Sequence, residues 1–239
     1  MLKTQRSCCQ LLRTKQLKTF ETKRLFYNQF LNKLVIVNPI AFIFRNFHGG
    51  YARRVIDNLQ SQYDSYEKEL MVRNGSRLFS VSHKTFLELK RLYNHLSSAP
   101  VEFKLRVEST YLCIYSNEIS FLRKIKHAAN NPKELWQPKV GIENRYQPYT
   151  IIVNAPPEYE YKVTLPGCRQ VDLGLADWAI ANPDKIKASS TVLERLKRGS
   201  YVQGYYFYVR DEKILNLVEL MLKRVGRIDK LVYVDDQDK

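Results

Sequence analysis

Two segments of this chain combine an aromatic, β-branched run with the start of an amphipathic helix. The first segment, Tyr111–Tyr115, leads to Asn117, and the second, Tyr205–Val209, leads to Asp211. Asn and Asp accept hydrogen bonds from the free N–H groups at a helix start, so each segment predicts a strand followed by a helix. A further helical segment precedes each strand, and we therefore predict a duplicated α-β-α unit.

The same hydrophobic patterns extend over the rest of the chain. Apolar residues at helical spacing predict helices over residues 51–71, 82–96, 117–130, 173–181, 192–198 and 212–225. Alternating or aromatic runs predict strands over residues 78–81, 102–107, 111–115, 149–153, 159–165, 201–209 and 231–234. The helix over 212–225 predicts that strands 201–209 and 231–234 are parallel neighbours in one sheet.

This element order predicts an α+β fold with two tandem α/β units, each with helices on one face of its sheet. A ferredoxin-like arrangement and one mixed sheet shared by both halves fit equally well. Residues 1–50 form a basic helical arm or targeting segment in this interpretation, 51–131 the first unit and 167–239 the second. Residues 132–166 hold six of the nine prolines and predict a linker with embedded strands.

Positive charge is concentrated near the N-terminus. The chain of 239 residues has a formal net charge of +15, and residues 1–56 contain 11 Lys and Arg against one acid, Glu21. Such a segment is typical of an organellar transit peptide, of a basic arm that binds phosphates, or of a solvated extension. The composition does not choose between these. It is compatible with an intracellular protein that has mitochondrial targeting or a viral origin.

The longest apolar run does not predict a membrane partner. Leu34–Phe44 is short and is interrupted by Asn38 and Pro39, whereas roughly 20 apolar residues are needed to span a bilayer. A buried strand or a turn of core helix is the better interpretation. The four cysteines form no Cys-x-x-Cys pair, so a reducing compartment is the default and a zinc site is not expected.

Few motifs indicate catalysis. The sequence lacks a phosphate-binding Gly-Lys-Ser/Thr loop, a dinucleotide fingerprint and a His-Glu-x-x-His pair, so we expect no cofactor and no metal. Acids at 235, 236 and 238 resemble a metal cluster, but a terminal acidic segment is usually solvated. His48-Gly49-Gly50 precedes Arg53 and Arg54, and is either an anion site or a hinge, of which we favour the hinge.

The aromatic strand over 201–209 is the better functional candidate. Alternate residues face opposite sides of a sheet, so either Tyr206 and Tyr208 or Tyr205 and Phe207 face outward. Outward aromatic rings beside Arg210 and Lys162 would stack single-stranded bases, as RNA-binding sheets do. The alternative is that the tyrosines only fill a half-buried strand.

Basic residues on both units would add affinity for phosphates, or would only provide solubility. We predict a non-enzymatic nucleic-acid-binding protein, RNA more than DNA, in a ribonucleoprotein or viral assembly. The alternative is a structural protein that binds other protein subunits with little dependence on salt. A small nuclease ranks last, because its candidates Glu118, Asp172, Asp177, Asp211 and Glu212 lie mostly at helix caps. The predicted binding residues are Arg53, Arg54, Lys90, Arg91, Lys104, Arg106, Arg123, Lys124, Tyr206, Tyr208 and Arg210.

Overall fold

The computed structural model describes residues 17–169, 174–222 and 224–234, which form two compact units. Unit 1 consists of the chain up to Phe20 and of Lys33–Trp136, and unit 2 consists of Glu21–Asn32 and Gln137–Lys239. Each unit has its own five-stranded sheet and its own hydrophobic core. The predicted α+β class with two tandem α/β units is confirmed, and the alternative of one shared sheet is wrong.

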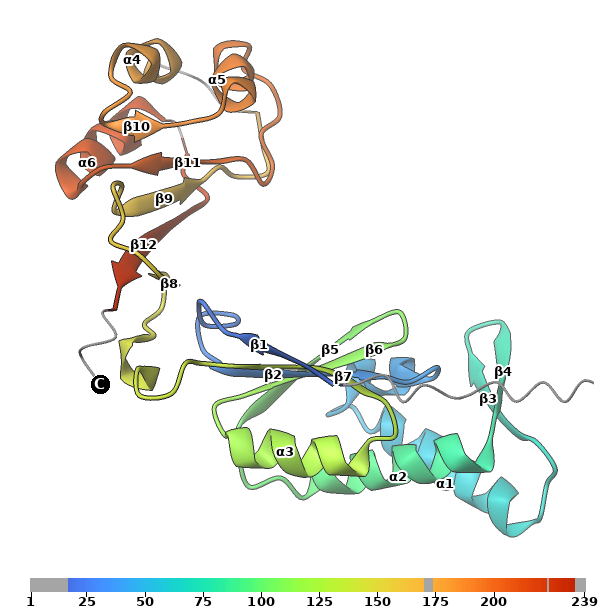
Figure 1. Cartoon of the computed structure of the whole chain (residues 1–239). Helices are drawn as coiled ribbons and strands as arrows, with labels where there is room; N and C mark the ends of the chain where they lie inside the picture. The colour runs from blue at the N-terminus through green and yellow to red at the C-terminus, as the bar shows by residue number, and fades with distance from the viewer. Residues whose placement is uncertain (1–16, 170–173, 223, 235–239) are drawn as a thin grey trace, which may run out of the picture. The chain divides into compact units, whose positions relative to one another are not determined.

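Unit 1 carries its three α-helices on one face of its sheet (Figure 1). A small β3-β4 hairpin pairs Asn74 with Arg77 and turns at Gly75 and Ser76. The elements are β1 (Lys18–Glu21), β2 (Asn32–Val37), the 3-10 helix η1 (Ala41–Asn46), α1 (Tyr51–Asp64), β3 (Leu70–Asn74), β4 (Arg77–Val81), α2 (His83–Ser97), β5 (Phe103–Glu108), β6 (Tyr111–Ser116), α3 (Ile119–Ala128) and β7 (Pro132–Gln137).

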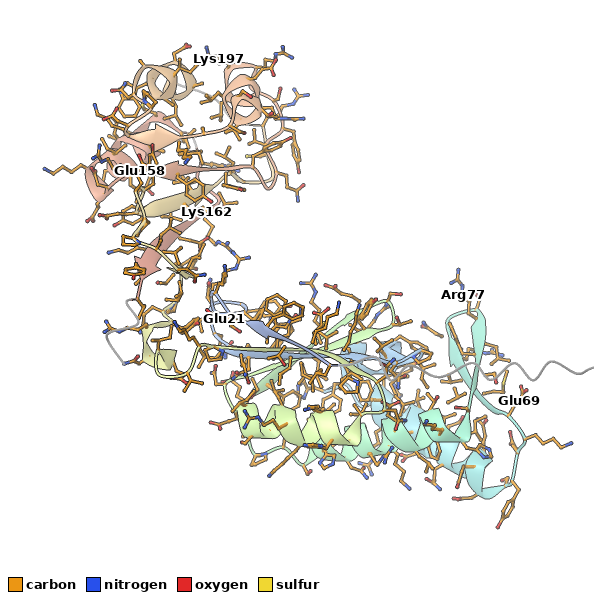
Figure 2. The ribbon with its side chains drawn as sticks, in the orientation of Figure 1. Glu21, Glu69, Arg77, Glu158, Lys162 and Lys197 are labelled. Atoms are coloured by element: carbon orange, nitrogen blue, oxygen red, sulfur yellow. The ribbon has the colours of Figure 1, made fainter. Side chains whose placement is uncertain are left out.

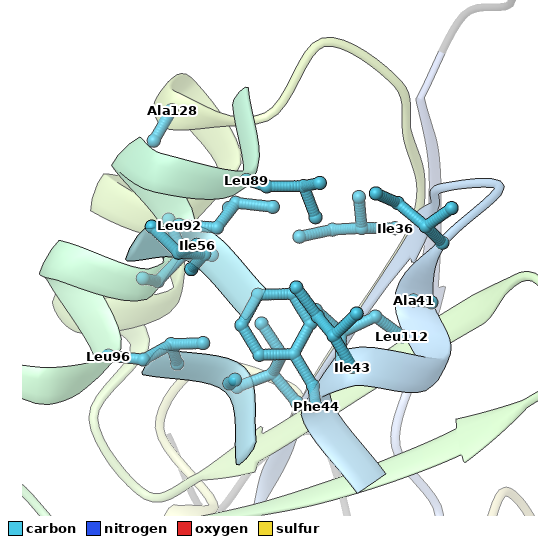
Figure 3. Packing of buried hydrophobic residues seen from close by; sticks show 14 of the residues in the cluster. Ile36, Ala41, Ile43, Phe44, Ile56, Leu89, Leu92, Leu96, Leu112 and Ala128 are labelled. Carbon is cyan, nitrogen blue, oxygen red and sulfur yellow. The ribbon is translucent and has the colours of Figure 1, made fainter. Parts of the chain in front are cut away.

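The core of unit 1 lies between the sheet and these helices. Ile36 of β2 and Leu112 of β6 point toward Leu89 and Leu92 of α2, and all four side chains are fully buried (Figure 3). Phe44 of η1 is part of the same cluster. The alternation of the strands therefore directs one set of residues to the helices and leaves the other set on the opposite face. No helix of the described residues covers that face, and we call it the helix-free face.

Unit 2 is built in the same way. Val163, Phe207 and Val209 point into a core with Leu196 of α5 and Val218 of α6. The elements are the 3-10 helix η2 (Glu143–Arg145), β8 (Thr150–Val153), β9 (Tyr161–Thr164), α4 (Leu175–Ala181), β10 (Ile186–Lys187), α5 (Ser190–Lys197), β11 (Tyr206–Val209), α6 (Glu212–Met221) and β12 (Arg227–Tyr233).

The two sheets have corresponding strand orders. Read from equivalent edges, unit 1 has the order β5-β6-β2-β7-β1 and unit 2 has the order β10-β11-β9-β12-β8. In each unit a helix, α3 or α6, connects two strands that have a third strand between them. Strand β9 is antiparallel to both β11 and β12, so those strands are parallel but are not neighbours. The prediction that they are adjacent is wrong, because β9 comes from the proline-rich region and takes the central position.

The helix caps show a one-residue difference from the predicted duplication. Asp211 caps α6 as predicted, since its carboxylate accepts from the Ile214 N–H at 3.0 Å. In unit 1 the cap position is Glu118 rather than Asn117. The Ser116 hydroxyl accepts from the Glu118 N–H at 3.2 Å, so the helix begins one residue later than expected.

This difference changes which residues of the two aromatic strands correspond. Aligning the cap positions pairs Tyr115 with Tyr208, both on the helix-free face, and Ile114 with Phe207, both in the core. The alignment at Asn117 and Asp211 would place corresponding residues on opposite faces of the two sheets. A slip of one residue exchanges the faces of a strand, so the cap decides the comparison.

The unit boundaries also differ from the predicted ones. The apolar run Leu34–Phe44 is a buried strand and helix turn, as expected, and belongs to unit 1 rather than to an arm. Strand β7 pairs with β2 in unit 1, while β8 and β9 belong to the sheet of unit 2. Residues 132–166 are therefore divided between the units, because their apolar side chains complete two sheets. Residues 1–16 of the predicted arm lie outside the described residues.

A buried carboxylate connects the helices of unit 1 to β2 and to the end of α3. Glu88 of α2 is 4% exposed and accepts from the Asn38 amide at 3.2 Å and from the Asn130 backbone N–H at 2.7 Å. The Asn38 side-chain oxygen accepts from the Ile40 N–H at 3.0 Å, which fixes the orientation of that amide. Burial raises the pKa of Glu88 above 4.5, against the opposing effect of these hydrogen bonds.

Candidate functional site

The helix-free face of the unit 2 sheet brings aromatic and charged side chains together. Cross-strand pairing sets Lys162 of β9 between Tyr208 of β11 and Asp229 of β12, and sets Lys187 of β10 on the other side of Tyr208. Directly paired residues lie on the same face of a sheet. Because the neighbouring positions Val163 and Phe207 enter the core, this face points away from the helices.

Tyr206 and Tyr208 form the aromatic part of this face. Their ring centroids are 5.6 Å apart with the planes nearly perpendicular, and Tyr206 is 44% exposed. The Lys162 Nζ lies 3.8 Å from the centroid of the Tyr206 ring, a favourable cation–π geometry. Figure 2 labels Lys162 among the side chains of unit 2. We call Tyr206, Tyr208, Lys162 and Lys187 the unit 2 platform.

An ion pair stands beside the platform. The guanidinium of Arg227 contacts one carboxylate oxygen of Asp229 through Nε and Nη2, both at 2.8 Å. The Asp229 side chain is almost completely buried, so the pair holds both groups in fixed positions. Lys162 lies next to this carboxylate across the β9-β12 pairing.

The environment shifts the pKa values of two platform residues. Burial lowers the pKa of the Lys162 amino group, Arg24 and Arg227 act in the same direction, and Asp229 opposes them. Burial raises the pKa of the Tyr208 phenol, and the neighbouring Tyr206 adds to this. Tyr208 therefore keeps its proton at neutral pH and can donate a hydrogen bond from the platform.

Two open hollows adjoin the platform, and Tyr208 lines both. The first has a volume of about 390 Å³ and lies toward Lys187, Ser189 and Gly204. The second has a volume of about 540 Å³ and lies toward Leu231, Ile151 and Pro157. These volumes are within the range of pockets that hold small organic groups. A planar ring stacked on a tyrosine could therefore continue into either hollow.

Some of the predicted binding residues lie on the helix-free faces of the two sheets, and the others lie on the helices of unit 1. Tyr206, Tyr208 and Arg210 follow one another on the helix-free face of unit 2, but Arg210 is paired with Asp184 at 3.7 Å. Lys104 and Arg106 lie on the helix-free face of unit 1, since Phe103, Leu105 and Val107 pack against its core. Arg106 is paired with Glu108 at 2.6 Å.

The other predicted cations lie on the helices of unit 1, on the opposite side of that sheet. Lys90 donates to Gln60 at 2.7 Å, and Arg91 borders a shallow hollow on α2. Arg53 lies 3.8 Å from Asp57 and is well exposed. The set on α1, α2 and α3 comprises Arg53, Arg54, Lys90, Arg91, Arg123 and Lys124. The predicted basic residues of unit 1 therefore lie on two opposite sides of its sheet.

The remaining candidates have local structural roles. The Gly49 and Gly50 N–H groups donate to the carbonyls of Asn46 and Phe47, so they are not available to bind an anion. Asp177 is paired with Lys197 at 2.5 Å, and Asp211 caps a helix. Asp172 and the acids at 235, 236 and 238 lie outside the described residues.

Sequence reasoning missed Lys187 and Asp229 of this face, and it counted Arg227 only among the basic residues of the second unit. Lys187 belongs to a two-residue strand, and a strand that short leaves no periodic signal. Arg227 and Asp229 alternate with Ile228 at the start of β12, which was predicted to begin only at residue 231. That alternation was a signal that could have placed both residues on the face of the platform.

Within the described ranges, no helix is long and apolar enough to cross a membrane. The described residues also contain no group of three His, Cys, Asp or Glu side chains placed to hold a metal ion. No protein-family model, curated protein or solved structure matches this chain.

Proposed function

We propose that the protein binds single-stranded RNA on the helix-free face of unit 2, without catalysing a reaction. The observation that carries this proposal is the outward pair Tyr206 and Tyr208, with the Lys162 ammonium 3.8 Å from the Tyr206 ring. Stacking on aromatic side chains and neutralisation of phosphates are the two contributions that single-strand binding requires.

The arrangement suggests how each group contributes. The exposed Tyr206 ring offers a stacking surface for one base, and the hollows beside Tyr208 offer room for the next. Lys187 and Lys162 stand on either side of Tyr208 and would bind the phosphates of a strand that crosses the sheet. The ion pair of Arg227 and Asp229 lies beside the platform on β12 and holds the Asp229 carboxylate next to Lys162.

We also propose a ferredoxin-like class for both units. The support lies in β2, β5, β6 and β7 with α3, and in β9, β10, β11 and β12 with α6. In each set the fourth strand lies beside the first, and the third lies between the first and the second. This is the split β-α-β arrangement of that class, to which each unit adds an edge strand, β1 or β8. A place in a ribonucleoprotein or viral assembly stays a prediction.

Binding to RNA is tested by titrating the full-length protein with a labelled single-stranded RNA, the DNA of the same sequence and an RNA duplex. We expect the single-stranded RNA to bind best. The slope of log K against log salt should be about −1 to −2, because Lys162 and Lys187 each bind one phosphate and each phosphate contributes roughly −0.7. Equal affinity for the duplex, or no detectable binding, would contradict the proposal.

A structural role that binds another protein is the second candidate function, and helix α6 provides the observation that favours it. Helix α6 exposes Leu217 and Leu220, and Leu220 is 78% exposed. Leu217 and Leu220 are three positions apart and so lie on one side of the helix, and a contiguous apolar patch on a surface can bind another protein. A structural role in an assembly would show binding to a protein partner that changes little with salt, and loss of that binding upon Leu220→Lys.

A further inference from the structure

The helix-free face of unit 1 repeats the arrangement of the unit 2 platform. In unit 2, Tyr208 of β11 lies between Lys187 of β10 and Lys162 of β9. In unit 1 the corresponding strands are β6, β5 and β2, as the matching sheet orders show. The residues on those strands therefore provide an internal comparison within one chain.

The same three residue types occupy the corresponding positions. Tyr115 of β6 pairs directly with Lys104 of β5, and the Lys33 Nζ of β2 lies 5.9 Å from the centroid of the Tyr115 ring. Tyr115 and Tyr208 also correspond when the caps of α3 and α6 are aligned. Both sheets thus carry a Lys-Tyr-Lys row across three adjacent strands.

The unit 1 row continues into a second pair of aromatic rings. Lys33 pairs with Trp136 of β7, and its Nζ lies 5.8 Å from the centroid of the indole. The Phe20 ring of β1 stacks on this indole with centroids 4.6 Å apart and an interplanar angle of 22°. Tyr115 is buried, whereas the Phe20 ring is exposed and the Trp136 ring is half-buried.

Hydrogen bonding and charge make this surface suitable for a nucleic acid. The Trp136 indole N–H donates to the Glu134 carboxylate at 3.1 Å, which holds the ring in place before any ligand binds. Alternation of the strands places four cations and two carboxylates on this face: Lys18, Lys33, Lys104, Arg106, Glu108 and Glu134. With four cations against two carboxylates, these described residues give the face an excess of positive charge, which favours an anionic ligand.

We propose that this face is a second binding site for single-stranded RNA. Trp136 and Phe20 stack a base, and Lys33 and Lys104 bind the adjacent phosphates. The inference rests on the proposed function, because it assigns the same class of ligand to a second copy of the same row. It adds a site on unit 1, built from Phe20, Lys33 and Trp136, none of which sequence reasoning identified.

The two tryptophans of the chain allow the site to be observed directly. Trp136 lies in this row and Trp178 lies in α4 of unit 2, so Trp178→Phe leaves Trp136 as the fluorescent reporter. An oligouridine of about five nucleotides is short enough to favour one site per strand. We expect saturable quenching of Trp136 as this RNA is added, while the anisotropy of the labelled RNA reports total binding.

Two sets of variants decide whether the site is separate and specific. In Tyr206→Leu/Tyr208→Leu the quenching should persist with a Kd within about twofold, since the two rows share no residue. Lys104→Gln should raise the Kd measured by Trp136 fluorescence roughly three- to tenfold, because it removes one charged partner of the phosphate. Lys124→Gln, which removes the same charge from α3 of the same unit, should change this Kd by less than about twofold.

Each other result overturns the inference. RNA binding by anisotropy without a response of Trp136 would show that unit 1 has no such site. Loss of the quenching in Tyr206→Leu/Tyr208→Leu, or equal effects of Lys104→Gln and Lys124→Gln, would do the same. The absence of any RNA binding by anisotropy would instead contradict the proposed function itself, and the inference with it.

Discussion

Replacing both platform tyrosines, as Tyr206→Leu/Tyr208→Leu, is expected to weaken binding of single-stranded RNA to unit 2 by about 2 kcal/mol or more, roughly thirtyfold. Each base stacked on an aromatic ring contributes about 1–3 kcal/mol to single-strand binding. Leucine keeps an apolar side chain on the sheet but removes the planar surface. Fluorescence anisotropy with a labelled oligonucleotide, in a Lys33→Gln/Trp136→Leu background that disables the unit 1 row, measures this loss.

The salt dependence separates stacking from charge in this experiment. The double variant removes no cation, so the slope of log K against log salt should stay unchanged while the affinity falls. Tyr66→Leu is the matched control, because Tyr66 is 91% exposed in unit 1 and lies outside the sheet. An affinity of the double variant equal to that of Tyr66→Leu would show that the tyrosines only fill the strand.

Replacing the buried carboxylate of α2, as Glu88→Gln, is expected to lower the free energy of unfolding of unit 1 by about 1–3 kcal/mol. Two donors, the Asn38 amide and the Asn130 N–H, point at the two carboxylate oxygens. The amide group of glutamine would present its own N–H₂ to one of them. Asn38 cannot reverse without losing the bond to the Ile40 N–H, so one buried donor loses its partner.

The cost of Glu88→Gln should also depend on pH. Because the folded-state pKa of Glu88 is raised above 4.5, its contribution to stability is fully present below 4.5 and is lost as the pH rises through the folded pKa. The difference between the parent protein and Glu88→Gln should therefore be larger at pH 4 than at pH 7. Urea unfolding followed by Trp136 fluorescence, in a Trp178→Phe background, measures it.

An exposed acid of the same unit provides the control for this prediction. Glu67→Gln removes the same charge from a solvated position after α1 and should change the unfolding free energy by less than about 0.5 kcal/mol at both pH values. If Glu88→Gln unfolds at the same urea concentration as Glu67→Gln, the buried network does not stabilise unit 1.

Local patterns predicted most of the secondary structure because each rests on nearby residues. The Asp211 cap and the strands β5, β6 and β11 all follow from signals within a few positions. The buried nature of Leu34–Phe44 was also predicted correctly from its composition.

Such local signals do not determine the order of the strands in each sheet. The insertion of β9 between β11 and β12 depends on contacts between segments about 45 and 65 residues away from it in the chain, which no local pattern encodes. Strand β7 was not predicted, because the many prolines of residues 132–166 indicated a linker. Proline is nevertheless compatible with a strand at its first residue or at a bulge, and Pro132 stands at the bulge opposite Ile36.

The candidate site was predicted only in part, because local alternation indicates which side of a strand a residue faces but not which strands are neighbours. Alternation limited the outward pair to two choices, and the core around Phe207 selects Tyr206 and Tyr208. The row of Lys33, Tyr115 and Lys104 was not found, because its members come from three strands and the expected cap at Asn117 misaligned the two units.

Photocrosslinking of a 4-thiouridine RNA to the full-length protein, followed by mass spectrometry of the crosslinked peptides, tests the central claim most directly. The claim is that RNA lies on the helix-free sheet faces. The account predicts crosslinks in the peptides that contain Tyr206 and Tyr208, and in those that contain Phe20 and Trp136. Crosslinks confined to the helical layer of unit 1, at Arg53, Arg54, Arg123 or Lys124, would contradict it.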